Sequence, residues 1–515
     1  MKKILIVLIA LLIIPSAMCT NWYVDKDAPS GGNGQSWATA WNSFSSIQWS
    51  SIQPGDTLYV SGGTTSKTYT DNLIIGISGS PGKRIRITKG TDSGHNGEVI
   101  LSYPINAQSS AAIYLSGKKH LIIENFKIVN WPQGVQIRNG NTPGSTQDII
   151  IQNNHITTAS QAGVGVNGWN QAGMYNYIQN VVIRNNYITS VQSTQAQTDL
   201  IYAQYFENLT IENNTLIQLN NWFDGSCKTS PHADPIQTNR GYNQIIRHNY
   251  IEYKHHNGCS LTLMLSLNIG NTDIYGNIIN SYLNGSDTAV KSIIGYKDGA
   301  LPPYDGPEYL RFYNNIIIGD HFQALYLISP LGTYEVKNNI FYSMIEGGAN
   351  GMDRSIVFLL NPPENMSNIN GNLYWGIGGY SVPQFYWITW SNRPRTWEQV
   401  QATGAEQNGL SEIPLFTNFD NKLFSLQIGS PGIDDGLSLN SKYNLAYNGI
   451  IRPQGAGWDI GAFEFVGGVQ CHSADVDCDG CFSLSEISSY VDLWLRGSVT
   501  LVEVSGAINL WLQGC

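Results

Sequence analysis

Charged side chains are scarce in this sequence of 515 residues. Lys, Arg, Asp and Glu make up 13% of it, against about 25% in an average soluble domain. Polarity comes instead from uncharged side chains and 53 glycines, beside 14 Trp and 28 Tyr. This composition favours a β-rich extracellular protein over a helical cytoplasmic enzyme. The net charge of −10 disfavours nucleic acid as a partner, because polyanions are repelled.

Long apolar runs are missing after the first 19 residues. No later segment reaches the roughly 18 apolar residues that a transmembrane helix needs, so the protein is not expected to span a membrane. The opening MKKILIVLIALLIIPSAMC combines two lysines, an apolar run and small residues, which is typical of a secretory signal peptide. We therefore expect residues 1–19 to be a signal peptide and the protein to be secreted, extracellular or at the cell surface. The alternative is a lipoprotein with Cys19 as its lipidated first residue.

Cysteine is rare, but its number is even once Cys19 is set aside. The remaining six are Cys227, Cys259, Cys471, Cys478, Cys481 and Cys515. Export would permit disulfides. A bond between Cys227 and Cys259 would staple a loop to the body of the protein. The pairing of the four later cysteines stays open, with Cys471–Cys515 and Cys478–Cys481 as one solution.

One eight-residue pattern recurs along the chain. VVIRNNYI at 181–188 has relatives in IIIQNNHI at 149–156, LTIENNTL at 209–216, LRFYNNII at 310–317 and YEVKNNIF at 334–341. Aligned on the second Asn, the anchors are Phe126, Asn154, Asn186, Asn214, Asn249, Asn277, Asn315, Asn339 and Asn372. Their mean spacing of about 31 residues lies in the range of solenoid repeats.

Each copy of the pattern predicts two short strands around an Asn bend. Apolar residues alternate with polar ones, and Asn tolerates the left-handed backbone of a tight bend. Strand, bend, strand, variable loop and strand is the layout of a right-handed parallel β-helix, an all-β solenoid. Equivalent bends would lie about 4.8 Å apart, so their amides would hydrogen-bond in a ladder. The long intervals 214–249 and 277–315 are expected to carry protruding loops.

Both ends of this array carry a family resemblance. NWYVDKDAPSGGNGQSWATAWNSF and IQPGDTLYVSGGT near the start, and LFSLQIGSPGIDDG and IIRPQGAGWDIGAFEF at 423–465, resemble secreted β-helix proteins of the pectate-lyase-like superfamily. The resemblance implies an N-terminal cap and a β-helix over residues 20–466. It specifies the fold better than the function, because such proteins include lyases, hydrolases, epimerases, adhesins and phage fibres.

A different motif marks the tail. DVDCDGCFSLSE at 475–486 matches the whole EF-hand pattern, and hard oxygen ligands at this spacing favour Ca²⁺. The predicted ligands are Asp475, Asp477, Asp479, the Cys481 carbonyl, Ser483 and Glu486.

Two apolar helical stripes follow in the tail. They consist of Ile487, Tyr490, Val491 and Trp494, and of Val504, Ala507, Ile508 and Trp511. Residues 471–515 thereby resemble a dockerin, which implies a protein partner. The second half lacks the acidic segment of that family, so we expect one calcium ion rather than two.

The coils around residues 134–240 carry the candidate chemistry. The strands in GVQIRNG, AGVGVNGW, TDLIYAQY and ADPIQTNR are expected to stack. With Ile201 and Ile236 facing inward, the residues that face a groove suited to an extended polymer are Tyr202, Gln204, Gln237 and Asn239. Asp199 and Asp234 would occupy matched positions about 5 Å apart. Two such carboxylates would share a cation, here a second Ca²⁺, or one would keep its proton as a general acid.

The cationic and aromatic residues near this acidic pair complete the predicted site. Lys228, His232 and Arg240 lie close in sequence, and the loop NNWFDGSCKTSPH supplies Trp222 as a further substrate contact. The alternative for each Asp is a cap on backbone amides at a coil corner.

This inventory suits β-elimination from a uronate, which needs a neutralised carboxylate and a base against the C5 proton. Asp199 and Asp234 would hold Ca²⁺, Arg240 would pair with the substrate carboxylate, and His232 or Lys228 would be the base. We therefore predict a polysaccharide lyase acting on an acidic glycan. The alternatives are a β-helix glycoside hydrolase and a non-catalytic glycan-binding or adhesive surface protein.

Overall fold

A computed structural model describes most of the chain from Cys19 onward. The described residues are 19–103, 111–142, 144–158, 161–171, 174–190, 199–218, 233–255, 262–283, 294–298, 309–319, 324–328, 333–344, 357–359, 365–376, 396–466, 474, 483–495, 504, 507, 508 and 511. The predicted signal peptide, apart from an exposed Cys19, lies outside this range.

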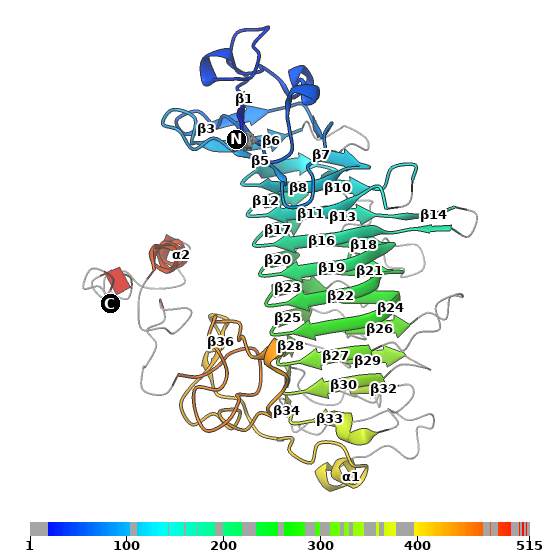
Figure 1. Cartoon of the computed structure of the whole chain (residues 1–515). Helices are drawn as coiled ribbons and strands as arrows, with labels where there is room; N and C mark the ends of the chain where they lie inside the picture. The colour runs from blue at the N-terminus through cyan, green and yellow to red at the C-terminus, as the bar shows by residue number, and fades with distance from the viewer. Residues whose placement is uncertain are drawn as a thin grey trace, which may run out of the picture.

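The body is a parallel β-helix with three sheets, here named A, B and C, which the chain visits in that order in each coil (Figure 1). Sheet A contains β1 (Asn21–Val24), β2 (Thr57–Val60), β5 (Ile85–Lys89), β8 (Lys119–Glu124), β11 (Gln147–Gln152), β16 (Ile178–Arg184), β19 (Phe206–Glu212), β22 (Tyr242–Arg247), β24 (Leu263–Tyr275), β27 (Tyr309–Tyr313), β30 (Thr333–Lys337) and β33 (Ile369–Asn370). Sheet B contains β3 (Ser66–Tyr69), β6 (Glu98–Ser102), β9 (Lys127–Trp131), β12 (His155–Thr158), β17 (Tyr187–Ser190), β20 (Thr215–Gln218), β23 (Tyr250–His255), β25 (Ile278–Leu283), β28 (Ile316–Gly319), β31 (Ile340–Ser343) and β34 (Leu373–Gly376). Sheet C contains β4 (Leu73–Ile74), β7 (Ala111–Ser116), β10 (Gln133–Arg138), β13 (Val164–Asn167), β18 (Ile201–Gln204), β21 (Ile236–Asn239), the first half of β24, β26 (Ile294–Asp298), β29 (Leu325–Ile328) and β32 (Val357–Leu359).

Identical apolar side chains stack in register inside the coils. In sheet A, Ile151 pairs with Ile183, which pairs with Ile211, which pairs with Ile246, and all four are fully buried. Because successive side chains of a strand point to opposite faces, each strand sends alternate residues into this core and the others outward. The apolar residues of the sequence pattern are therefore the ones that face the core, and the residues between them face outward.

The predicted Asn ladder is present, and the two residues of each pair have different tasks. The first residue takes the left-handed conformation, as Asn153, Asn185 and Asn213 show with φ of 54–55°. The second turns its amide inward and bonds to its neighbour one coil on. Asn186, for example, donates from its backbone N–H and from Nδ2 to Oδ1 of Asn214, at 3.0 and 3.1 Å.

The same bonds repeat from one end of the solenoid to the other. Phe126 N–H donates to the first amide, and the ladder then runs through Asn154, Asn186, Asn214, Asn249, Asn277, Asn315, Asn339 and Asn372. These amides are between 0 and 2% exposed. A buried polar row of this kind is stable because its donors and acceptors are satisfied by each other and by backbone carbonyls of the same and adjacent coils.

Glu406 ends the ladder where a further Asn would stand. Its carboxylate accepts from Asn372 N–H at 3.1 Å and Nδ2 at 2.7 Å, and from the Tyr374 hydroxyl at 2.7 Å. The side chain is fully buried, and burial raises the pKa of Glu406 to about 7. Just before it, α1 (Trp397–Ala402) lies at this end of the solenoid (Figure 1).

Residues 405–466, here called the strap, fold back along the last coils (Figure 1, orange). The strap contains β35 (Phe416–Asn418) and β36 (Leu423–Leu426), which pair antiparallel. Lys422 Nζ lies 2.6 Å from Glu252, and Asn338 exchanges two hydrogen bonds with the backbone of Leu437. Phe416, Phe424 and Leu426 pack on the outer face of sheet B, which explains why β28 and β31 are apolar on both faces.

The opposite end is closed by aromatic residues before the first complete coil. Trp22 and Trp41 stack at 5.4 Å, and Phe44, Ile47 and Ile52 are buried beside them. This cap covers the apolar end of the solenoid and limits edge-to-edge association.

The tail contains α2 (Leu484–Leu495). As the sequence predicts, Ile487 and Tyr490 pack with Val504 and Ala507. The last member of each predicted stripe differs, because Trp494 and Trp511 are each 37% exposed. Within the described residues, no helix is long and apolar enough to cross a bilayer.

Candidate functional site

The outer face of sheet C carries two rows of outward residues, one per coil in each row, and all of them except Gly165 have polar side chains. One row runs Tyr114, Gln136, Gly165, Tyr202 and Gln237, and the other runs Ser116, Arg138, Asn167, Gln204 and Asn239. The alternate residues of these strands point inward to the core, among them Ile201 and Ile236, which precede the two rows in their strands. The predicted outward register of Tyr202, Gln204, Gln237 and Asn239 therefore agrees with the pairing of the strands.

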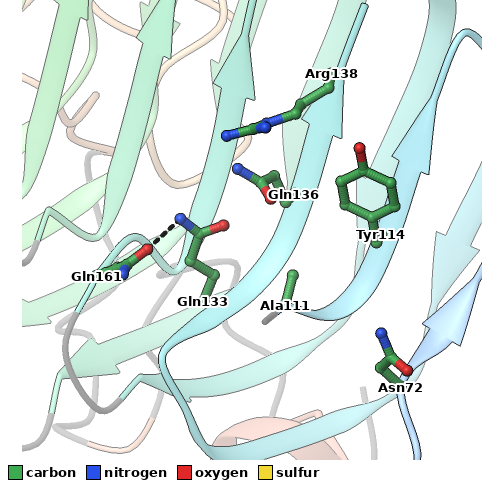
Figure 2. A pocket seen from close by; sticks show the side chains of 7 residues that line it. All are labelled: Asn72, Ala111, Tyr114, Gln133, Gln136, Arg138 and Gln161. Atoms are coloured by element: carbon green, nitrogen blue, oxygen red, sulfur yellow. Dashed lines mark hydrogen bonds between the residues drawn. The ribbon is translucent and has the colours of Figure 1, made fainter. Parts of the chain in front are cut away.

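Two cavities hollow this face. The first has a volume of about 350 Å³ and is lined by Asn72, Ala111, Tyr114, Gln133, Gln136, Arg138 and Gln161 (Figure 2). The second has a volume of about 510 Å³ and is lined by Tyr114, Ser116, Arg138, Asn139, Asn141, Asn167, Gly168, Trp169 and Gln204. Tyr114 and Arg138 line both cavities, so together the two form one groove that these side chains divide.

The groove is electrostatically unlike the chain as a whole. Arg138 is exposed, and within the described part of the chain it forms no ion pair. The outward rows of β7, β10, β13, β18 and β21 contain no Asp or Glu. A local excess of positive charge therefore lies on a protein whose net charge is −10, which allows an anionic ligand to approach this face.

Amide and hydroxyl groups make up the remainder of the groove. The Tyr202 hydroxyl donates to Gln204 at 2.9 Å, Gln204 Nε2 donates to Asn167 at 3.3 Å, and Gln133 donates to Gln161 (Figure 2). Burial, with Asp199 nearby, raises the pKa of Tyr202 above its ordinary value. Tyr202 is therefore a hydrogen-bond donor at neutral pH and is unsuited to act as a base.

Asp199 and Asp234 are adjacent, as the sequence predicts, but their geometry favours the capping alternative. Asp199 Oδ1 accepts from the backbone N–H of Asp234 at 3.0 Å. The two residues are 3% and 0% exposed. A carboxylate that satisfies a buried backbone amide contributes to the coil corner.

Arg240 lies at the bend that leads from sheet C to sheet A. It takes a left-handed conformation with φ of 52°, and its guanidinium lies over the Tyr205 ring at 5.7 Å. Its side chain is partly exposed, beside the groove rather than in its outward rows.

Other predicted residues lie outside the described part of the chain. These are Lys228, His232 and Trp222, and the cysteines Cys227, Cys259, Cys471, Cys478, Cys481 and Cys515.

Four of the six predicted calcium ligands, Asp475, Asp477, Asp479 and Cys481, are also outside it. The remaining two form a capping box at the start of α2. Glu486 Oε2 accepts from Ser483 N–H at 2.8 Å and from its hydroxyl at 2.7 Å, while Glu486 N–H donates to Ser483 Oγ at 3.2 Å. In the structure the Glu486 carboxylate therefore caps the N-terminus of α2, and its predicted role as a calcium ligand stays a prediction.

Sequence reasoning missed Tyr114, Arg138 and Trp169. Arg138 stands in the aligned strand GVQIRNG at the position of Gln204 and Asn239, so the register alone would have placed it in the groove. Trp169 follows β13, and nothing in its local pattern separates a groove residue from a loop residue.

No family model and no curated protein matches this sequence. Among solved structures, the pectate lyase Pel9A has a TM-score of 0.52 and 14% identity, over 86% of this chain and 96% of that one. XylC in complex with xylose has a TM-score of 0.45 and 11% identity, over 87% and 98%. An alginate lyase from Paenibacillus sp. str. FPU-7 has a TM-score of 0.33 and 15% identity, over 67% and 96%. The likeness to Pel9A shows a shared fold, the parallel β-helix.

Proposed function

We propose that this chain is a secreted polysaccharide lyase that binds an acidic glycan along the groove on sheet C. The observation that carries the proposal is Arg138, which is exposed and forms no ion pair with any residue that the structure describes. It lies on a strip of amides and hydroxyls, and the outward positions of the strands that form this strip carry no carboxylate. A guanidinium binds a carboxylate through two parallel hydrogen bonds, and the amides match sugar hydroxyls. The fold shared with a pectate lyase is a supporting argument from analogy.

In this proposal Arg138 neutralises the carboxylate of a bound uronate, which makes the proton at C5 more acidic. Tyr114 and Tyr202 orient the sugar through their hydroxyls. The base would be Lys228 or His232, the two residues that the sequence analysis assigns to this role. It removes the C5 proton, a double bond forms between C4 and C5, and the glycosidic oxygen leaves from C4.

A second candidate is a non-catalytic glycan-binding protein. It is favoured by the burial of Asp199 and Asp234, since the described groove then offers no carboxylate as an acid or base. The groove would in that case hold a polymer without cleaving it.

A panel of linear uronate polymers, each beside its carboxyl-reduced neutral counterpart, separates these candidates. A lyase generates ultraviolet absorbance from the new double bond with at least one acidic polymer and with no reduced one. Arg138→Gln should lower this rate at least tenfold, whereas Lys83→Gln, which removes an exposed cation elsewhere, should leave it unchanged. Binding without new absorbance or new ends would support the second candidate, and absence of binding would refute both.

For the tail we propose a single Ca²⁺-binding loop at 475–486 and a protein partner. Metal binding and folding are coupled in small domains of this kind. A chelator should therefore make the tail of the full chain sensitive to a protease, while the β-helix stays intact. Equal cleavage with and without calcium would contradict the proposed site.

A further inference from the structure

Two neighbouring coils differ from the coils next to them at the bend between sheets C and A. In the adjoining coils this bend is short: residues 117–118 join β7 to β8, Tyr205 alone joins β18 to β19, and Arg240 and Gly241 join β21 to β22. After β10, however, the chain inserts segment 139–146. After β13 it inserts a hairpin of β14 (Trp169–Gln171) and β15 (Met174–Asn176), which projects from the solenoid in Figure 1.

Hydrogen bonds lock these two insertions to each other. Asn139 Nδ2 donates to the Asn176 carbonyl at 2.7 Å, and Gly144 N–H donates to Asn176 Oδ1 at 3.1 Å. Asn139 and Asn176 are 7% and 0% exposed. Buried, satisfied amides of this kind fix a loop in one conformation. We name the locked pair of insertions the groove wall.

The hairpin can leave the coil only because residue 168 is glycine. A Cβ on Gly168 would lie 2.2 Å from the Tyr205 carbonyl oxygen and 2.7 Å from that of Asn176. The backbone packs so closely at the point where the hairpin leaves the coil that only glycine fits there.

The groove wall places one aromatic ring against the larger cavity. Trp169 is partly exposed and lines the 510 Å³ cavity, and its indole N–H donates to the Gly140 carbonyl at 3.2 Å. This bond fixes the edge of the ring. Ser116, Asn167 and Gln204 also line this cavity, and Arg138 lines both cavities.

We propose that Trp169 is a stacking platform for one sugar ring, and that the cavity in front of the groove wall is a subsite for that ring. A pyranose has a C–H face that packs on an aromatic ring, and hydroxyls at its rim that match amides and a serine hydroxyl. The volume lies within the range of small-ligand sites. The inference rests on the proposed function for its ligand, but it concerns the ring face, which acidic and neutral sugars share.

Binding of the two matched oligosaccharide sets, acidic and carboxyl-reduced, tests this subsite in the full-length protein. Trp169→Ala should weaken binding of both sets about tenfold, whereas Arg138→Gln should weaken only the acidic set. Trp169→Phe keeps an aromatic face and loses the N–H, so it should stay within about threefold of the wild type. Tyr187→Ala, which removes an aromatic side chain 39% exposed on sheet B, is the matched control and should bind like the wild type.

The outcomes separate the two ideas. If Trp169→Phe binds as weakly as Trp169→Ala, the residue acts by holding the groove wall through its N–H, and the stacking proposal is wrong. Unchanged binding by Trp169→Ala also overturns it, even if the protein cleaves acidic polymers. If the wild type binds neither set, both this proposal and the proposed function fail.

Discussion

The Asn ladder and the polar rows of the groove both place polar side chains at matched positions on successive coils, yet they use their hydrogen-bonding groups differently. In the ladder, each amide bonds to the next amide and to backbone carbonyls, as Asn214 does with Asn249 and Ile183. In the groove, Tyr202, Gln204 and Asn167 bond in a short chain, and Arg138 faces solvent. Stacking the coils in register therefore makes the ladder rigid, because its amides bond to one another. In the groove the same stacking leaves polar groups available to bind a ligand.

The largest predicted effect comes from breaking the ladder at its centre. In Asn214→Ala, the N–H and Nδ2 of Asn186 lose their acceptor and the Ile183 carbonyl loses a donor. Because each buried polar group left without a partner costs about 1–3 kcal/mol, we expect a loss of about 3–5 kcal/mol in the free energy of unfolding. Denaturant unfolding measures it. Asn33→Ala, at an exposed site, should change stability by no more than about 0.5 kcal/mol, and similar values for the two variants would refute the role of the ladder.

The end of the ladder should make stability depend on pH. Burial raises the pKa of Glu406 from 4.5 to about 7, so the folded state favours the protonated form. The contribution is fully present below pH 4.5 and is lost as the pH rises through 7, by about 3 kcal/mol. Comparing unfolding of the wild type and Glu406→Gln between pH 4 and 8 isolates this loss.

A second buried acid titrates in the same pH range, but its contribution to stability is the same in both proteins and cancels in the comparison. Burial raises the pKa of Asp459 in the strap to about 7 as well, and that residue is present in both proteins. Parallel pH profiles for the wild type and Glu406→Gln would contradict the assignment.

The bend residue before each ladder amide should tolerate glycine and reject branched side chains. Asn185 has φ of 54°, and Gly276 and Gly371 occupy the same position in other coils. Asn185→Val should destabilise the protein by about 1–2 kcal/mol, while Asn185→Gly should stay close to the wild type in the same unfolding experiment. Equal losses would show that the side chain of Asn185, rather than its backbone, sustains the bend.

The smallest effect on stability is expected in the groove. Arg138→Gln removes an exposed charge without an ion pair in the described structure, so the free energy of unfolding should change by less than about 0.5 kcal/mol. Its effect should appear in binding of acidic polymers alone. A clear loss of stability would instead indicate that Arg138 holds the coil together, and the contrast between ladder and groove would weaken.

The repeat made the fold readable from the sequence, because nine registered anchors leave few alternatives. It did not reveal that Glu406 replaces the final Asn, since a single Glu after a helix has no repeat to belong to. The groove wall was also missed. The interval from Asn154 to Asn186 includes all three bends of one coil, so its length does not show which of the three bends carries the extra residues. Asp199 and Asp234 were correctly aligned, but alignment does not decide whether a carboxylate faces a ligand or a backbone amide.

The strap divides the molecule into two parts with different freedom to change size during evolution. It grips the coils from His248 onward, through Leu445, Lys422 and Leu437, so inserting or deleting a coil there would misalign every one of these attachments. Before His248, each ladder amide forms hydrogen bonds only with its own coil and with the coils directly above and below it. Duplication of a whole coil is therefore tolerable in the first part and prohibited in the second, which makes the groove end the natural place for new specificities to arise.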